Sequence, residues 1–124
     1  MDKNNLFEII SRFICHKNLY KSSDNTVKIA AFMPHPQYKC LSVFGVSGLC
    51  ENEIFELGSR VKSDKLYGFA NIDAVSINNI GLDIDADNNP YRHANIIGWP
   101  EEYSEIQLKA AQMALKAKLF LKIK

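Results

Sequence analysis

The sequence has no long apolar run and no strong excess of either charge. No stretch approaches the roughly 18 apolar residues that span a bilayer, and Glu8 and Arg12 interrupt the N-terminal segment where a secretory signal would be apolar. We therefore expect a cytosolic protein without a membrane segment. The formal net charge is only +1, which disfavours a nucleic-acid partner held through its phosphates.

Cysteine is scarce, and the common cofactor-binding and catalytic signatures are missing. Cys15, Cys40 and Cys50 are odd in number and lack C-x-x-C spacing, so we expect three reduced thiols rather than disulfides or a zinc knuckle. The sequence contains no P-loop, G-x-G-x-x-G, G-x-S-x-G or H-E-x-x-H motif. It therefore indicates no cofactor and gives no motif support for a nucleotide site, a serine hydrolase or a zinc protease.

The length and apolar content suit one self-sufficient domain. The chain has 124 residues, of which 47% are hydrophobic, enough to bury roughly two thirds of the unfolded surface. We find no linker, repeat or low-complexity tract. The order of helical and strand patterns predicts a single α+β domain over residues 1–124, with a small, largely antiparallel sheet packed against helices.

The first half of the chain shows one helical pattern, two strand patterns and a second helical pattern. Residues 5–15 have apolar residues at helical spacing after Asn5 as a cap, which predicts an amphipathic helix. Residues 26–33 and 39–46 are β-like and flank a proline-containing loop, which predicts an antiparallel hairpin. A helix is then expected from Cys50 as cap and Glu53 at the third position, with Ile54, Leu57 and Val61 on one face.

The second half is less regular until its end. Residues 67–72 are typical of a strand, and residues 73–79 of either a short capped helix or a continuation of that strand. Residues 92–99 predict a short strand after the Asn88-Asn89-Pro90 turn. Residues 104–123 predict the strongest helix, with one apolar stripe: Ile106, Ala110, Met113, Ala114, Ala117 and Leu121.

Three segments resemble a family pattern. VKIAAFMP, LSVFGVSGL with ENEIFELG, and RHANIIGWP together resemble a family of small, uncharacterised bacterial proteins. The resemblance covers about three quarters of the chain. It implies that these segments belong to one domain, and it attaches no activity or ligand to any residue.

Residues 83–100 concentrate the side chains that could carry chemistry. Asp83, Asp85 and Asp87 alternate, so on an extended segment they point the same way, as ligands of a hard cation would. Asn88 and Asn95 stand where an EF-hand loop needs glycine and a bidentate glutamate. We therefore predict no metal site and interpret the three carboxylates as a solvated strand edge that opposes aggregation.

His93 and Asn95 share one face of the expected strand, and Arg92 lies beside them. An imidazole can act as general acid or base while the amide orients a substrate, and the guanidinium can hold an anion at the rim. The structural alternative makes His93 a partly buried residue bonded to backbone and Arg92 a partner of an aspartate. Cys50 at a helix start could be a thiolate, but the sequence places no base near it.

Two functional hypotheses follow. The first is a small binding module with a protein or small-molecule partner, acting through the segment from Asp83 to Trp99. Its contact residues would be Tyr91, Arg92, His93, Asn95 and Trp99. The alternative is a small hydrolase or group-transfer enzyme that acts on an anionic small molecule, with His93 as acid/base, Arg92 as anion clamp and Asn95 as the orienting amide.

Overall fold

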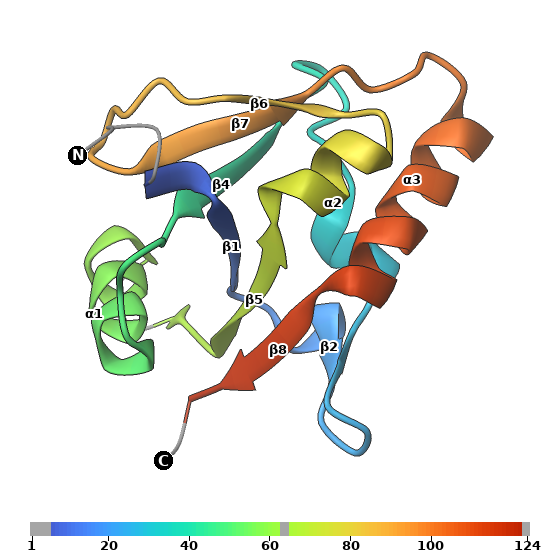
Figure 1. The fold of residues 1–124 in the computed structure, drawn as a ribbon. Coiled ribbons are helices and arrows are strands. Elements are labelled where there is room, and N and C mark those ends of the chain that lie inside the picture. Colours follow the sequence, from blue (N-terminus) through green and yellow to red (C-terminus); the bar gives the residue numbers. More distant parts are fainter. Residues whose placement is uncertain (1–5, 63–64, 123–124) are drawn as a thin grey trace.

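The chain forms one six-stranded antiparallel sheet with helices on both faces (Figure 1). The structure, a computed structural model, describes residues 6–62 and 65–122. The strand order is β6-β7-β4-β1-β5-β8, with bounds β1 Ile9–Ile14, β4 Leu41–Gly45, β5 Gly68–Asp73, β6 Asp83–Asp85, β7 His93–Ile97 and β8 Lys118–Leu121. The predicted α+β class and antiparallel sheet are confirmed.

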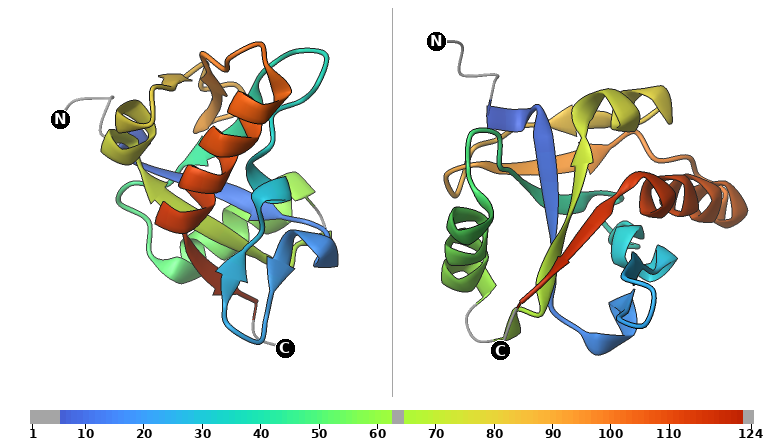
Figure 2. Two further views of the ribbon diagram at one scale, coloured as in Figure 1. Left: turned by 90° about the vertical axis from the view of Figure 1, so that its right-hand side faces the viewer. Right: turned by 60° about the horizontal axis from the view of Figure 1, so that its bottom comes forward.

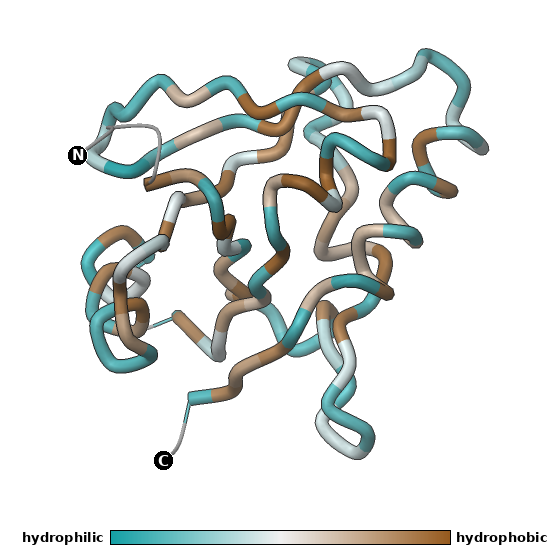
Figure 3. The backbone as a smooth tube through the Cα atoms, in the orientation of Figure 1, coloured by the Kyte–Doolittle hydropathy of each residue, from teal (hydrophilic) through white to brown (hydrophobic). Residues whose placement is uncertain are grey.

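The helices divide between the two faces of the sheet. The second view of Figure 2 shows α1 (Glu51–Lys62) on one side, and α3 (Tyr103–Lys116) with the 3-10 turn η3 (Ile29–Phe32) on the other. A short helix, α2 (Ala74–Asn79), packs on the larger core together with α3 and η3. Hydrophobic and hydrophilic bands alternate along α1 and α3 in Figure 3, as expected for helices with one buried face.

The first predicted helix, over residues 5–15, is wrong for the described residues. Ile9–Ile14 is β1, hydrogen-bonded between β4 and β5 at the centre of the sheet, while the expected cap, Asn5, lies outside the described residues. Ile10 packs in the core beneath α3, and Phe13 packs in the smaller core beneath α1. Because both faces are covered, apolar residues do not alternate, and their spacing matches a helix equally well.

The predicted hairpin is also wrong, although its second strand is confirmed as β4. Only Thr26–Val27 of the first run is a strand, β3, and it pairs with β2 (Tyr20–Lys21) in a separate two-stranded ladder. The next residues form η3, preceded along the chain by η2 (Lys17–Leu19). A helical turn lets the adjacent residues Ala31 and Phe32 both enter the core, whereas a strand would place them on opposite faces.

The predicted C-terminal helix is confirmed only as far as Lys116. The chain then leaves Ala117 in an extended conformation and forms β8, which pairs with β5 at the edge of the sheet. Ile106, Ala110 and Met113 of the predicted stripe are buried beneath α3, while Leu121 lies on β8. Residues 123–124 lie outside the described residues.

Other local predictions are confirmed. The Cys50 amide donates to the Glu53 carboxylate at 2.9 Å. This bond, followed by a smaller contribution from a hydrogen bond of the Cys50 side chain, holds the pKa of Glu53 below its ordinary value. Asp73 caps α2 by accepting from the Ser76 amide, so the helix alternative holds there. Among the described residues, no helix has the length and apolar character needed to cross a membrane.

Candidate functional site

The candidate site lies where β4 and β7 pair, on the face of the sheet that also carries α1. Ser42 is directly opposite Asn95, and Phe44 is opposite His93. Directly opposed residues share a face, so His93 and Asn95 project on the same side as Ser42. Ala94, between them, is fully buried in the opposite core. The predicted grouping of His93 with Asn95 on one strand face is therefore confirmed.

His93 joins two side chains that lie far from each other in the sequence. Its Nε2 is 2.8 Å from Ser42 Oγ, and its Nδ1 is 2.7 Å from Asp87 Oδ1. The ring also meets the edge of Phe44, with centroids 5.3 Å apart. The His93 side chain is only 14% exposed, whereas Asp87 is 40% exposed. Ser42, His93 and Asp87 therefore form a hydrogen-bonded series of hydroxyl, imidazole and carboxylate.

The Asp87 carboxylate determines which nitrogen of His93 carries the proton. The hydrogen bond from His93 is the main cause that lowers the pKa of Asp87 below its ordinary value. An ionised carboxylate only accepts hydrogen bonds, so Nδ1 must be the donor to Asp87. In the neutral ring, Nε2 is then an acceptor, and the Ser42 hydroxyl donates to it.

The loop before β7 holds Asp87 against His93. The Asn88 amide donates to the His93 carbonyl at 2.9 Å, and the His93 amide donates to the Pro90 carbonyl at 2.8 Å. Asn88 and Arg92 both have positive φ, at 53° and 74°, and the Asn88 side chain accepts from the Arg92 amide at 2.6 Å. The Asn89 amide donates to Asp87 Oδ1 at 3.3 Å. These bonds set the position of the carboxylate.

The Arg92 side chain points to the end of β4 and the loop that follows it, rather than to Ser42. Its NH1 donates to the carbonyl oxygens of Gly45 and Ser47, both at 3.1 Å. The guanidinium also lies 5.5 Å above the ring of Tyr91. Arg92 NH1 therefore holds the end of β4 and the loop after it in place. The structural alternative pairs Arg92 with an aspartate, whereas in the structure this nitrogen bonds to backbone carbonyls.

Tyr91, Asn95 and Trp99 have three different environments. Tyr91 is 62% exposed. Asn95 Nδ2 donates to Asp87 Oδ2 over 3.4 Å, a long and weak bond. Trp99 is buried in the main core, with its indole N–H donating to the Ile96 carbonyl at 2.9 Å. Trp99 therefore supports β7 from the core side and presents little surface to a partner.

Arg12 lies beneath the site, on the opposite face of β1. Its Nε donates to the Ala31 carbonyl at 2.9 Å and its NH1 to the Ser42 carbonyl at 3.0 Å. Burial lowers the pKa of Arg12, because the charged form loses hydration. Its two hydrogen bonds offset that loss and connect η3 with the strand that carries Ser42.

Sequence reasoning missed Ser42 and interpreted Asp87 as part of a solvated, acidic strand edge. A serine inside a β-like run carries no motif, and its pairing with β7 is visible only in the fold. The described residues include no group of three or more His, Cys, Asp or Glu side chains arranged to share a metal ion. Cys50 is exposed, and the ring of His35 lies against the ring of Tyr38, tilted by 30° with centroids 4.6 Å apart.

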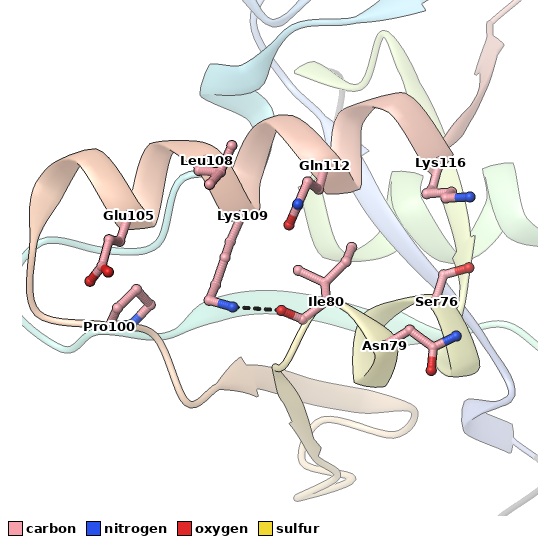
Figure 4. Close-up of a pocket in the computed structure, with 9 residues that line it drawn as sticks. All are labelled: Ser76, Asn79, Ile80, Pro100, Glu105, Leu108, Lys109, Gln112 and Lys116. Atoms are coloured by element: carbon pink, nitrogen blue, oxygen red, sulfur yellow. Dashed lines mark hydrogen bonds between the residues drawn. The ribbon is translucent and has the colours of Figure 1, made fainter.

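A separate pocket lies between α2 and α3, on the other face of the sheet (Figure 4). It has a volume of about 510 Å³. Within it, the Lys109 ammonium donates to the Ile80 carbonyl at the end of α2, which closes that helix end. Other polar side chains that line it come from both helices, as Figure 4 shows for Asn79 on α2 and Gln112 on α3. None of the predicted site residues lines this pocket.

Comparisons of the chain with family models, with curated proteins and with solved structures find no match. We therefore infer the chemistry of the site from its geometry alone. The strongest geometric feature is the line of Ser42, His93 and Asp87, because both hydrogen bonds of the imidazole are short and go to groups with defined roles in proton transfer.

Proposed function

We propose that the protein is a small hydrolase or acyl-transfer enzyme in which Ser42 is the nucleophile. The single observation that carries this proposal is the pair of bonds from His93, to Ser42 Oγ at 2.8 Å and to Asp87 Oδ1 at 2.7 Å. A nucleophile, a base in contact with it and a group that orients the base form the arrangement by which serine is activated in unrelated folds.

In the first step, Ser42 Oγ attacks the carbonyl carbon of an ester. His93 Nε2 takes the hydroxyl proton as the Oγ–carbon bond forms, and the Asp87 carboxylate stabilises the resulting imidazolium through Nδ1. The carbon–oxygen bond to the leaving alcohol then breaks, and that alcohol takes the proton from Nε2. The product of this half-reaction is an acyl ester on Ser42.

The same groups catalyse the second half-reaction, in which water attacks the acyl ester on Ser42. His93 Nε2 removes one proton from a water molecule, whose oxygen attacks the acyl carbon. The bond to Ser42 Oγ breaks, and Oγ recovers the proton from Nε2. The carboxylic acid leaves, and an alcohol or amine in place of water gives acyl transfer with the same balance.

Asn95 is the side chain best placed to orient the substrate. It is directly opposite Ser42 in the ladder, and its weak 3.4 Å bond to Asp87 leaves the amide able to donate to a developing oxyanion. Arg92 acts as a positioning residue in this proposal, because its NH1 bonds fix the carbonyls of Gly45 and Ser47.

A fluorophosphonate probe tests the nucleophile directly. We expect the probe to form one adduct, mapped to Ser42 by peptide mass spectrometry, and the protein to hydrolyse p-nitrophenyl acetate. Ser42→Ala should abolish the adduct, and His93→Ala should slow its formation by at least about 100-fold, the lower range for a positioned base.

The matched control is Ser104→Ala, which removes an exposed serine from the start of α3 and should leave labelling unchanged. Thermal unfolding of each variant checks that it is folded. Labelling at another serine, no labelling of the folded parent, or an equal labelling rate in folded His93→Ala would each rule out Ser42 as an activated nucleophile.

A second candidate function is a binding module that uses the surface of residues 83–97. The exposure of Tyr91 and the guanidinium above its ring favour it, since exposed tyrosine and arginine are common at binding hot spots. If this function holds, the folded parent does not react with the probe, and Tyr91→Ala removes a partner recovered with the parent but absent from the variant.

A further inference from the structure

A second cavity lies on the α1 face of the sheet, away from Ser42. It has a volume of about 430 Å³, within the range of small-molecule sites. It is an open groove bordered by the start of α1, the loop before α1, and the ends of β1, β5 and β8. The cavity shares no lining residue with the Ser42, His93 and Asp87 arrangement.

One part of the cavity wall is apolar. Ile9, Ile54 and Phe120 line it from three different elements. Ile9 is 37% exposed, although it begins the central strand, and Phe120 stacks on the buried Phe69 with centroids 5.0 Å apart. Apolar side chains left open on a rigid sheet are suited to contact with the hydrocarbon part of a ligand.

Two lysines line the same cavity, of which Lys116 also lines the pocket between α2 and α3. Lys116 ends α3 and Lys118 begins β8. The Lys118 ammonium lies 5.5 Å from the centroid of the Phe120 ring, so it is held over the apolar wall. Among the described residues that line the cavity, only Asp73 is acidic, and its carboxylate already accepts the Ser76 amide as the cap of α2. The local charge therefore favours an anion.

A polar group without a partner also lines the cavity. Asn71 Oδ1 is buried and makes no hydrogen bond. Ser11 is directly opposite Asn71 on β1, is fully buried, and its hydroxyl likewise has no partner. An unsatisfied buried polar group costs about 1–3 kcal/mol. This cost is internal to the sheet, because Asn71 Oδ1 has essentially no exposed surface that a ligand in the cavity could reach.

We propose that this cavity binds a small organic anion with an apolar body, whose carboxylate or phosphate lies between Lys116 and Lys118. The apolar body packs on Phe120 and Ile9. The proposal is independent of Ser42 chemistry, because none of Ser42, His93 and Asp87 lines this cavity.

Three probes of one shape and different charge test the proposal: phenylacetate, 2-phenylethanol and 2-phenylethylamine. They are titrated into the isotope-labelled protein and followed by amide NMR. We expect the shifts to centre on Gly48, Asn71 and Phe120, and the affinity to fall from the anion to the alcohol to the amine. The paired variant Lys116→Ala with Lys118→Ala should weaken phenylacetate binding about fivefold or more, and phenylethanol binding little.

Lys17→Ala with Lys28→Ala is the matched control, since it removes the same charge from exposed sites elsewhere. It should leave phenylacetate binding unchanged, as should Ser42→Ala. Equal affinities for the three probes, shifts centred elsewhere, no binding, or equal weakening by the control pair would each overturn the proposed site. These outcomes are distinct from loss of fluorophosphonate labelling, which concerns only Ser42.

Discussion

At the scale of single residues, His93 is the centre of the candidate site because both of its ring nitrogens have side-chain partners. A histidine that only filled space beside Phe44 would need no such pairing. Each bond is worth about 0.5–1.5 kcal/mol net. Removing the ring should therefore destabilise the protein modestly, by less than the roughly 3 kcal/mol typical of a broken buried network.

The first prediction concerns the carboxyl group of Asp87. His93 is the main cause of its lowered pKa, so His93→Ala should return that pKa toward the ordinary value of about 3.9. The carboxyl carbon shift of Asp87, followed by NMR against pH, measures this directly. Asn95→Ala is the control and should move the titration less, because Asn95 makes only the long 3.4 Å bond.

The same contact affects stability against pH in a defined direction. A carboxyl with a lowered pKa in the folded state stabilises that state above its unfolded pKa, and the contribution disappears as pH falls through the lowered value. The difference in unfolding free energy between the parent and His93→Ala should therefore shrink below about pH 4. An unchanged Asp87 titration in folded His93→Ala would contradict this assignment.

The sequence predicted only part of this site, for a physical reason. Strand alternation places His93 and Asn95 on one face, because the period of a strand depends only on neighbouring residues. Ser42 is on another strand, and no local pattern shows which strands pair. The alternation of the three aspartates predicts one acidic strand edge, whereas Asp87 lies in the loop after β6 and its side chain bonds to His93.

At the scale of elements, the spacing of apolar residues predicted the wrong structure in two places. One is a strand buried on both faces, and the other is the point where a helix ends and a strand begins. β1 has cores on both faces, so its apolar residues follow no strand alternation. At the other end, helical spacing continues past Lys116, but Ala117 adopts an extended conformation and β8 completes the sheet. The helix α1 was predicted and α2 was one of two alternatives, because the cap of each depends on residues three apart. A cap pattern alone is not sufficient, since residues 9–14, which follow the expected cap Asn5, form β1.

The second prediction tests how α3 is docked. Met113 is fully buried beneath the helix, so Met113→Asp would place a charge in the core and should cost at least about 3 kcal/mol. Leu115→Asp is the matched control on the same helix, where the side chain is 86% exposed, and should cost less than about 1 kcal/mol. Urea denaturation measures both, and similar costs for the two variants would show that α3 is not docked in this orientation.

At the scale of the whole molecule, the sheet connects segments from both ends of the chain. The first strand in the sequence lies at the centre and the last at an edge, so the core closes only when β8 pairs with β5. Arg12 adds a connection from the central strand to η3 and to β4. The candidate site on β4 and β7 therefore depends on packing contributed by distant parts of the chain.

The third prediction tests the pairing of β8 with β5. A Cβ added at Gly68 would collide with the backbone carbonyl of Phe120, so Gly68→Ala should push β8 away and destabilise the protein by about 1–3 kcal/mol. If residues 118–121 instead continued α3, the carbonyl would not lie there, and alanine would be neutral or stabilising by up to about 1 kcal/mol. Urea denaturation gives the sign, and amide exchange at Leu119 and Leu121 shows whether the loss is at β8. Unchanged stability together with unchanged protection of these two amides would refute the close approach of the two strands.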